Sequence, residues 1–398
     1  MQAAQWEQPR FLVEMGYSRS PAEILSLIQS NKQLTLEFLN GQDTCNTLNF
    51  GKLLGEGKSG SVFEIDDPTN KGLPVVLKEF TAKENPKRKD KSNGKTVYVL
   101  SSSLNDIVMS SVFHSFFAGE LDYCVSFPYF EGFFVCEGLG YAIIEQLDTT
   151  MARWIGSDDF NAESLRTLIF QCFYLILFMN KKQIVHNDMH AKNIMIGRTK
   201  NVSYRGSQIN KSDYLAFAIG NKTYYLPNRG MIGKLVDFDF ATQYGDPSIV
   251  PNKVYVKEED EWNLQYRFST SYDALTFVAY LIFYVTIRKP GKEGADKISS
   301  SEIKKSRLMV EQVAEFFVNR IERDIGKIRD KGHYAKEANG TVRPRDAISK
   351  LMDVVAVPCY RPAEKYCHLD LTGLLDIECF ADYKTMRNGA LLVGSLAL

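Results

Sequence analysis

The stretch His186-Asn-Asp-Met-His-Ala-Lys-Asn193 decides the fold, because it places a carboxylate, an imidazole and a carboxamide at short, fixed spacing. Further along the chain lies a second motif, the acidic turn Leu235-Val-Asp-Phe-Asp239. Oxygen atoms of Asp and Asn are the ligands that Mg²⁺ prefers, and a carboxylate beside them can orient a hydroxyl nucleophile. Each aspartate alone could be an ordinary turn residue, but together they indicate a magnesium-dependent phosphoryl-transfer site.

A glycine-rich turn lies upstream of both motifs and reads Gly55-Glu-Gly-Lys-Ser-Gly-Ser-Val62. Glycines let backbone N–H groups close over phosphates, because no Cβ stands in the way. The pattern alone has low specificity, since glycine-rich hairpins are common. A dinucleotide-binding βαβ unit needs a helix directly after the glycines, whereas the predicted strand Ser61–Ile65 follows here. The turn therefore favours a flap over phosphates.

Lys78 ends the apolar run Val75-Val-Leu-Lys78 within a strand predicted over 73–80. A strand that faces a core rarely carries a charge without a reason. The ammonium group could reach the α- and β-phosphates of a nucleotide beneath the glycine-rich turn. The alternative is an edge-strand lysine, which protects an exposed strand against aggregation.

These motifs, in this order, resemble those of the eukaryotic-type protein kinases over roughly residues 50–290. The resemblance implies an α+β, bilobal fold with a β-rich N-lobe, a helical C-lobe and ATP between them. The expected domains are a helical N-terminal extension over 1–45, the N-lobe over 46–147 and the C-lobe over 148–398. The implied activity is transfer of the γ-phosphoryl group of ATP to a serine or threonine hydroxyl of a protein substrate.

The resemblance also implies which residues bind ATP. Backbone groups of the glycine-rich turn would cover the phosphates, and Lys78 would hold the α- and β-phosphates. The segment from Glu145 to Leu147 would form the hinge that holds the adenine, with Ile144 beside it as gatekeeper. The predicted ATP-binding residues are Gly55, Gly57, Gly60, Val62, Lys78, Glu145 and Leu147.

Catalytic and metal-binding roles follow from the same resemblance. Asp188 would orient and deprotonate the acceptor hydroxyl, and Asn193 and Asp237 would bind Mg²⁺. Asp273, at the start of a buried helix predicted over 272–286, would tie the catalytic loop to that helix. Phosphoryl transfer consists mostly of positioning and charge neutralisation, so few groups suffice. The predicted catalytic residues are Asp188, Lys78 and His190.

Departures from the general family pattern are informative. His190 stands where Ser/Thr kinases usually carry lysine, Asn187 replaces the arginine of H-R-D, and Asp239 replaces the glycine of D-F-G. No A-P-E follows, and a long insert separates Asn193 from Asp237. This combination resembles the haspin-type kinases and, more closely, their relatives encoded by large nucleocytoplasmic DNA viruses. It implies a strand pair in the insert and activity without activation-loop phosphorylation. Without an arginine at 187, a loop phosphate would lose its bidentate partner.

Two roles stay open at this point. His190 could donate a hydrogen bond to the γ-phosphoryl oxygens, or it could merely order the catalytic loop. The family pairs the strand lysine with a glutamate on the first N-lobe helix, here predicted over 103–117. Asp106 is the favoured partner of Lys78, and Glu120, which lies past the helix, is the alternative. With neither partner the protein could be a pseudokinase.

Two other functions fit part of the pattern. Small-molecule kinases of the aminoglycoside and choline type also use H-x-D-x-H-x-x-N followed by D-x-D or D-x-E, which this chain matches. The complete glycine-rich turn and the insert argue against them. A non-catalytic kinase-fold scaffold would need a broken nucleotide site, yet Lys78, Asp188, Asn193 and Asp237 are all present.

Composition limits the remaining classes. The 398 residues carry no net charge, so nucleic acid is not indicated as a partner. Seven cysteines without a C-x-x-C pair argue against a disulfide framework and a zinc site. The apolar runs 168–179 and 274–285 fall short of the roughly 18 residues of a spanning helix, and no signal core opens the chain. We therefore expect a protein of the cytoplasm or nucleus, or of the host cytoplasm or virion if it is viral.

Charged segments and helix signals complete the expectations. The acidic run Glu258-Glu-Asp-Glu261 favours basic segments around the acceptor hydroxyl, unless it is only a solvated loop. The mostly basic stretch over 83–95 is predicted as a solvated loop. A helix capped by Asn161 and a charged amphipathic helix over 301–330 belong to the expected C-lobe.

Overall fold

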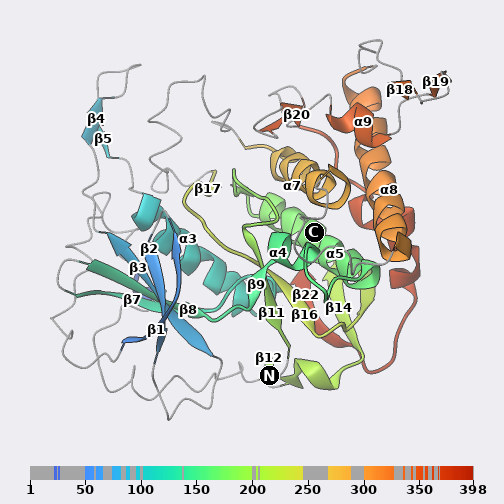
Figure 1. The fold of residues 1–398 in the computed structure, drawn as a ribbon. Helices are drawn as coiled ribbons and strands as arrows, with labels where there is room; N and C mark the ends of the chain where they lie inside the picture. Colours follow the sequence, from blue (N-terminus) through green and yellow to red (C-terminus); the bar gives the residue numbers. More distant parts are fainter. Residues whose placement is uncertain are drawn as a thin grey trace.

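In the computed structural model the protein has a mixed α/β fold, with a sheet-rich N-terminal part and a helical C-terminal part (Figure 1). Of the extension predicted over 1–45, only residues 22–24 and 26 are described; they are helical, and Ile24 is buried. The other positions of that prediction lie outside the described residues. The structure describes residues 22–24, 26, 50–57, 60–65, 74–81, 87–89, 96–98, 102–136, 139–199, 203–204, 207–244, 268–287, 300–326, 335–336, 342–343, 347–352, 355–356, 361–362, 366 and 368–397.

Antiparallel strands form the N-terminal sheet, in the order β1-β2-β3-β8-β7. β-Branched and aromatic residues, which favour extended backbone, fill these segments. This confirms the strands predicted over 61–65, 133–136 and 141–145, and the strand predicted over 73–80 begins at Val75. Their bounds are Phe50–Gly57 (β1), Gly60–Ile65 (β2), Val75–Thr81 (β3), Phe130–Cys136 (β7) and Leu139–Glu145 (β8).

Helix α3, Ser102–Phe117, packs on this sheet and matches the helix predicted over 103–117. Its Phe113 ring stacks on Phe127 with centroids 4.6 Å apart and contacts the Phe238 ring at 4.4 Å. Phe238 belongs to the acidic turn, which follows much later in the chain. One aromatic cluster therefore joins α3 to that turn.

The basic stretch over 83–95 departs from its prediction as a loop. Lys87–Lys89 (β4) and Thr96–Tyr98 (β5) pair as a short antiparallel hairpin. The basic composition of the stretch favoured a solvated loop and obscured this pairing. Pairing satisfies backbone N–H and C=O groups that a loop would leave to water.

Helices fill the C-terminal part. The Asn161 side chain accepts a hydrogen bond from the Ser164 N–H and caps α5, as predicted. α7 continues into a π-helical turn over Phe283–Ile287. α8 ends before the predicted residue 330, because Gly326 adopts φ 95°, a left-handed conformation that ends helices. The helices are Met151–Ile155 (α4), Ala162–Lys181 (α5), Tyr272–Ile282 (α7), Ser300–Asp324 (α8) and Ala347–Met352 (α9).

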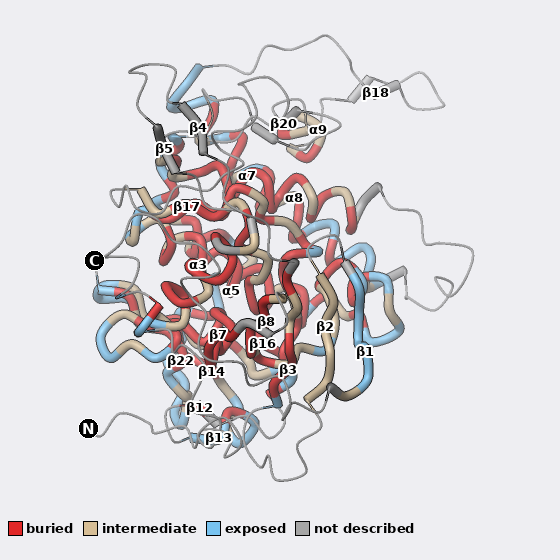
Figure 2. The backbone as a smooth tube through the Cα atoms, turned by 90° about the vertical axis from the view of Figure 1, so that its left-hand side faces the viewer, coloured by how far each residue is buried: buried red, intermediate tan, exposed pale blue. Residues whose placement is uncertain are grey.

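Helix α5 lies in the buried interior of the C-terminal part (Figure 2). In the described part of the chain it is the one helix long and apolar enough to cross a membrane. However, 83% of that apolar window is buried inside the protein, which is the burial of a core helix.

Short strands bring the two acidic motifs together. The loop over 186–193 runs from β10 to β11, and the acidic turn directly follows β16. Because β11 pairs with β16 and β10 with β17, both motifs emerge next to each other. These strands are Thr149–Thr150 (β9), Ile184–Val185 (β10), Ile194–Arg198 (β11), Met231–Leu235 (β16) and Thr242–Gln243 (β17), with β9 also paired to β11.

The insert between the two motifs contains the implied strand pair, β14 (Tyr214–Ile219) and β15 (Lys222–Pro227). A strand that was not predicted, β22 (Leu391–Leu396), pairs parallel with β14 and antiparallel with β6 (Tyr123–Cys124) (Figure 1). Gly394 allows this approach, because a Cβ there would lie 2.8 Å from an atom of the Phe217 ring. β22 thus joins the insert to a segment that precedes residue 147.

Smaller elements complete the described fold. They are the strand pairs Ser203–Tyr204 (β12) with Ser207–Gln208 (β13), Ala335–Lys336 (β18) with Val342–Arg343 (β19) and Val355–Ala356 (β20) with Arg361–Pro362 (β21), and the 3₁₀ helices Ile209–Lys211, Leu374–Asp376 and Glu378–Lys384.

Candidate active site

The loop over 186–193 is anchored by Asp273 in the first turn of α7. Its carboxylate accepts hydrogen bonds from the backbone N–H groups of His186 at 2.7 Å and Asn187 at 2.9 Å. Asn187 has a left-handed backbone, φ 64°, which asparagine tolerates better than most residues. Its Nδ2 donates to the Phe240 carbonyl at 3.0 Å and to Thr242 Oγ1 at 3.3 Å. Asp273 ties the loop to the buried helix, as predicted, and Asn187 ties it to the segment after the acidic turn.

Asp188, His190 and Asn193 form one hydrogen-bonded cluster inside the loop. Asn193 Nδ2 donates to the Asp188 carbonyl at 3.0 Å and to Asp188 Oδ2 at 3.2 Å. The Asn193 N–H donates to the His190 carbonyl at 2.8 Å and also reaches His190 Nδ1 at 3.2 Å. With Nδ1 as an acceptor, the neutral ring carries its proton on Nε2. Nε2 lies 3.5 Å from Asp188 Oδ2. The imidazole therefore orders the loop and also presents a donor beside Asp188.

Lys78 pairs with Asp106, as predicted, at 2.5 Å between Nζ and Oδ2, while Glu120 is exposed beyond the end of α3. The edge-strand interpretation of Lys78 is wrong, because β3 lies at the centre of its sheet. Burial lowers the pKa of Lys78, but the Asp106 and Asp237 carboxylates outweigh burial and the net shift is upward. The lysine therefore keeps its charge beside the acidic turn.

Asp237 stands among other carboxylates. Burial raises the pKa of its carboxyl group to about 7, with Lys78 opposing this shift and Asp106 and Asp239 adding to it. Its Oδ1 is buried and has no hydrogen-bond partner among the described residues. An orphaned oxygen in a negatively charged surrounding is what a divalent cation would satisfy, so this residue fits Mg²⁺.

Asn193 fits the same ion as a neutral ligand. Its Nδ2 group is used on Asp188, which leaves Oδ1 as the oxygen available to a cation. Within the described residues, no cluster of three or more His, Cys, Asp or Glu side chains forms a self-contained metal site. Mg²⁺ commonly binds through one or two protein oxygens plus substrate phosphates, so a sparse protein ligand set is compatible with it.

Asn105 contacts the candidate site and was not predicted from the motifs. It precedes Asp106, and its Nδ2 donates to backbone carbonyls of the acidic turn, while Asp106 Oδ1 accepts the Phe238 N–H at 3.0 Å. The available signal was a carboxamide within a largely apolar helix segment, because a buried amide needs hydrogen-bond partners. Nothing in the motif pattern indicated where those partners would be.

The glycine-rich turn is a hairpin between β1 and β2. Gly55 pairs with Val62 and Gly57 with Gly60, whereas residues 58–59 at its tip lie outside the described range. A Cβ on Gly55 would meet nothing within 4 Å, so packing in the protein does not explain glycine at this position. Room of this kind is what a backbone that closes over phosphates needs.

Gly60 is required by the fold itself. Its φ is 144°, and a Cβ there would run into the backbone carbonyl of Glu79 on β3. On β2, Val62 pairs with Lys78 of β3. The lysine therefore lies on the strand next to the hairpin.

The side chain of Glu145 takes part in a buried ion pair. Its Oε2 accepts hydrogen bonds from Lys234 Nζ at 2.8 Å and from the Tyr129 N–H at 3.0 Å, and its own N–H donates to the Tyr129 carbonyl at 2.9 Å. Burial raises the pKa of Glu145 more than Lys234 lowers it. The N–H group and the Oε2 oxygen of Glu145 are therefore already engaged within the protein. Lys234 was missed, although a lysine in the buried strand β16 required a counter-charge.

Leu147 follows the end of β8 and is half-buried. No hydrogen bond of its backbone N–H occurs among the described residues. A Cβ at position 197 would lie 3.3 Å from Leu147 Cδ2. Glycine at this position therefore allows Leu147 to approach β11 closely. Ile144, the predicted gatekeeper, is also half-buried and pairs with Val76 and Phe130 in the sheet.

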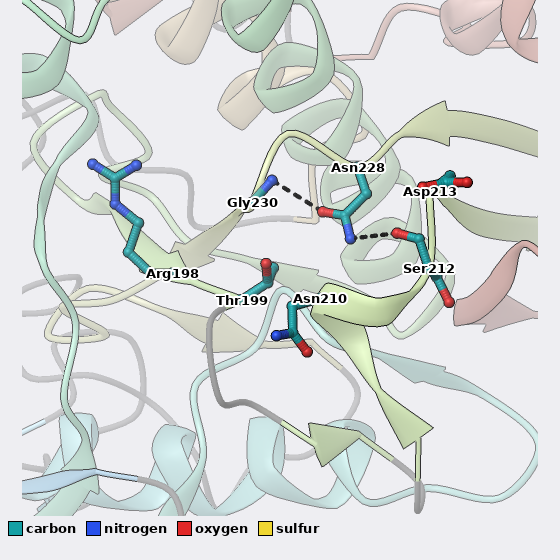
Figure 3. Close-up of a pocket in the computed structure, with 7 residues that line it drawn as sticks. All are labelled: Arg198, Thr199, Asn210, Ser212, Asp213, Asn228 and Gly230. Atoms are coloured by element: carbon teal, nitrogen blue, oxygen red, sulfur yellow. Dashed lines mark hydrogen bonds between the residues drawn. The ribbon is translucent and has the colours of Figure 1, made fainter.

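A separate surface pocket of about 570 Å³ lies where β11 meets the insert (Figure 3). Asn228 fixes one wall, because its Nδ2 donates to the Ile209 and Ser212 carbonyls and its Oδ1 accepts the Gly230 N–H. The polar groups of Asn228 therefore hold the insert together, and no predicted site residue lines the pocket. Its lining is Arg198, Thr199, Asn210, Ser212, Asp213, Asn228 and Gly230.

No protein-family model and no curated protein matches this chain. Among solved structures, the chain is similar to the crystal structure of the kinase domain of PF14_0431, with a TM-score of 0.32 and 14% sequence identity over 54% of this chain. It covers 55% of that chain, so it spans about half the length of the structure it matches. Because both the TM-score and the identity are low, the fold assignment depends on the strand order and side-chain placement of this protein and not on the match.

Proposed function

We propose that this protein is an ATP- and Mg²⁺-dependent serine/threonine protein kinase with a two-lobed, kinase-like fold. The observation that carries the proposal is the Asp106 carboxylate, which accepts the Lys78 ammonium on one oxygen and the Phe238 N–H on the other. One side chain thereby joins the strand lysine to the acidic turn. A charged lysine beside several carboxylates suits phosphoryl transfer, which needs positioning and charge neutralisation.

Each polar group of the loop and turn has one task in this proposal. Asp188 accepts the proton of the acceptor hydroxyl, and His190 presents its Nε2 proton beside that carboxylate. Asn193 and Asp237 hold Mg²⁺, which when bound neutralises charge on the phosphates. Lys78 neutralises the α- and β-phosphate oxygens.

ATP is held by backbone groups at both ends of its site. The glycine hairpin covers the phosphates, and the hinge holds the adenine through the Leu147 N–H and the Glu145 carbonyl. The open space at Gly55 and the N–H of Leu147 support these roles. The proposed ATP-binding residues are Gly55, Gly57, Gly60, Val62, Lys78, Glu145 and Leu147.

We also propose activity without activation-loop phosphorylation, as the resemblance to haspin-type and viral kinases implies. Asn187 supports this, because its amide bonds the Phe240 carbonyl and Thr242 Oγ1 without needing an anion. An arginine at this position would instead pair best with a phosphate. Residues 245–267, which follow this segment, lie outside the described residues, and so does the acidic run predicted to favour basic substrates.

Labelled ATP tests the function directly. Wild-type protein and Asp188→Ala are incubated with γ-labelled ATP, Mg²⁺ and a generic basic protein, and the products undergo phosphoamino-acid analysis. We expect phosphoserine and phosphothreonine from the wild type and at least about a hundredfold less from Asp188→Ala. Equal labelling by both proteins would refute the assigned role of Asp188.

A small-molecule phosphotransferase is the second candidate, because Asp239 gives the turn the D-x-D form and lies close enough to Lys78 to raise its pKa. Adding aminoglycosides or choline to the same assay separates the two enzymes. Transfer to the small molecule with an unlabelled basic protein would favour this candidate. A non-catalytic scaffold would give no transfer to any acceptor.

We further propose that the protein acts in a reducing compartment, the cytoplasm or nucleus, or the host cytoplasm or virion if it is viral. The supporting observation is that Cys124 and Cys172 are free, buried thiols, and burial raises the pKa of both.

A further inference from the structure

Asn105 lies on α3 directly before Asp106, and its exposed fraction is 0%. Its Nδ2 group donates toward backbone carbonyls of Phe238 at 2.7 Å, Ala241 at 3.0 Å and Asp239 at 3.2 Å. Buried carbonyls that are not part of a helix or sheet need donors from elsewhere. One side chain of α3 thus supplies the donor for most of a turn that belongs to a distant part of the chain.

The turn held by Asn105 has a backbone that needs restraint. Asp237 adopts φ 67°, in the left-handed region that residues other than glycine rarely occupy. Such a conformation persists where the surroundings over-determine it. Here the Phe238 N–H donates to Asp106 Oδ1 at 3.0 Å, and the Ala241 N–H donates to the Phe238 carbonyl at 3.0 Å. Asn105 and Asp106 therefore hold the turn through its carbonyls and its N–H together.

The side chain of Phe238 adds an apolar anchor to the same contact. Its ring lies 4.4 Å from the Phe113 ring of α3 and 5.7 Å from the His186 ring of the catalytic loop, measured between centroids. Any rotation of α3 would disturb these contacts, the Asn105 hydrogen bonds and the Lys78–Asp106 pair at once. The helix and the turn thus behave as one unit.

We propose that Asn105 is a positioning residue which, with Asp106, clamps the Asp237–Ala241 turn in the conformation that binds Mg²⁺. The turn is then ordered before nucleotide or metal arrives. The consequence for catalysis rests on the proposed kinase function, whereas the clamp itself is a property of the protein alone. Asn105 acts through the backbone of the turn, and so its effect reaches the metal only by way of Asp237.

Hydrogen exchange of the ligand-free protein tests the clamp without any activity. Asn105→Ala removes the amide donor, and Ser111→Ala is the matched control. Ser111 is also buried on α3, and among the described residues its Oγ bonds only within the helix, to the Ile107 carbonyl at 3.0 Å. We expect amides of the turn, Phe238 and Ala241 above all, to exchange roughly tenfold faster in Asn105→Ala. Amides of α7 should exchange at the wild-type rate in both variants.

The Mg²⁺ dependence of phosphoryl transfer provides the second measurement. In Asn105→Ala the Mg²⁺ concentration for half-maximal rate should rise by roughly five- to tenfold, because part of the binding free energy would be used to order the turn. Ser111→Ala should keep the wild-type Mg²⁺ dependence even if its melting temperature falls equally. A shift in melting temperature alone, with unchanged exchange and Mg²⁺ dependence, would overturn the proposal.

Asn105→Ser keeps the test decisive if Asn105→Ala does not fold. The serine hydroxyl retains one donor. The exchange rate of the turn amides should therefore lie between those of the wild type and Asn105→Ala, and above that of Ser111→Ala. Wild-type exchange in Asn105→Ser and in Ser111→Ala would reject the clamp. A wild type that transfers no phosphate, but whose turn loosens in the Asn105 variants, would reject the kinase function and leave the clamp supported.

Discussion

Two lysine–carboxylate pairs in this protein have the same chemistry but different surroundings. Lys78–Asp106 and Lys234–Glu145 both join a strand lysine to a carboxylate on another element, at 2.5 and 2.8 Å. The Lys78 side chain is 19% exposed, and Asp106, Asp237 and Asp239 all lie close enough to raise its pKa. The Lys234 side chain is 3% exposed and is enclosed by the Phe127 carbonyl and the Phe117 ring.

We expect this difference to separate a pair that serves activity from a pair that serves stability. Around Lys78 the carboxylates outnumber the ammonium, so the region is short of positive charge and is suited to take up a cation. Around Lys234 one ammonium group faces one carboxylate. The Tyr129 N–H donates a further hydrogen bond to the carboxylate, and the Phe127 carbonyl accepts one from the ammonium. Mutations should therefore affect the first pair through activity and the second through stability.

Lys234→Met should give the largest effect on stability. Removing one partner leaves Glu145 buried without a counter-charge, and such losses cost about 3–5 kcal/mol. Urea unfolding at neutral pH measures the change. The double variant with Glu145→Gln should recover part of the loss, because the uncompensated charge disappears with its partner. Equal stability of Lys234→Met and wild type would contradict the structural role.

Lys78→Met should reverse this pattern. We expect kcat/KM for phosphoryl transfer to fall by roughly 10²–10³, the usual cost of one charge-stabilising donor. Its free energy of unfolding should change less than that of Lys234→Met, because the site is partly open to water. Initial rates and urea unfolding on the same preparation check both statements. A fall in stability with an unchanged rate would place Lys78 with the structural pair.

Glu131 extends the comparison to a buried carboxylate without a lysine. It lies on β7, burial raises its pKa to about 7, and its Oε2 has no hydrogen-bond partner among the described residues. The folded protein therefore binds the carboxyl proton of Glu131 more tightly than the unfolded chain does. The stabilisation that this bound proton provides is lost as pH rises from about 4.5 to 7. Glu131→Gln should raise the free energy of unfolding by about 2–3 kcal/mol at pH 8 and have little effect at pH 4. Parallel pH curves for both proteins would contradict this.

Arg198 provides the smallest expected effect. Its guanidinium contacts Asp148 at 3.0 Å and Asp159 at 3.4 Å, and all three side chains are largely exposed. Exposed ion pairs contribute less than about 1 kcal/mol and are screened by salt. Arg198→Ala should thus melt within a few degrees of the wild type, with the difference shrinking at high salt. A loss as large as that of Lys234→Met would mean that exposure does not separate these pairs.

The sequence predicted the parts of the site that lie in short motifs with fixed spacing. Asp188 and Asn193 belong to one loop, so their spacing can be read from the sequence. Asp106 was preferred to Glu120 as the partner of Lys78 because the predicted helix ends before Glu120. Asn105 and Lys234 could not be placed in the same way, because their partners lie far away in the chain and are backbone carbonyls or a hinge carboxylate. A buried polar residue shows that a partner exists but does not show which one.

The fold shows the same limit. Strands and helices with local signals, such as β8 and α5, agree with their predictions. The pairing of β22 with β14 could not be predicted, because it joins residues 391–396 to residues 214–219 and neither segment specifies its neighbour. The hairpin β4–β5 was obscured by its basic composition, and the Glu145–Lys234 ion pair could not be predicted because a hinge motif does not show which way a side chain turns.

The position of β22 has a consequence for biosynthesis. Its neighbours β14 and β6 leave the ribosome long before residues 391–396 are made, so a nascent chain presents an unpaired strand edge on β14. Chaperones that bind exposed strands are expected to engage the chain during this interval. Resistance of the sheet to protease should therefore arise only after translation has passed Leu396.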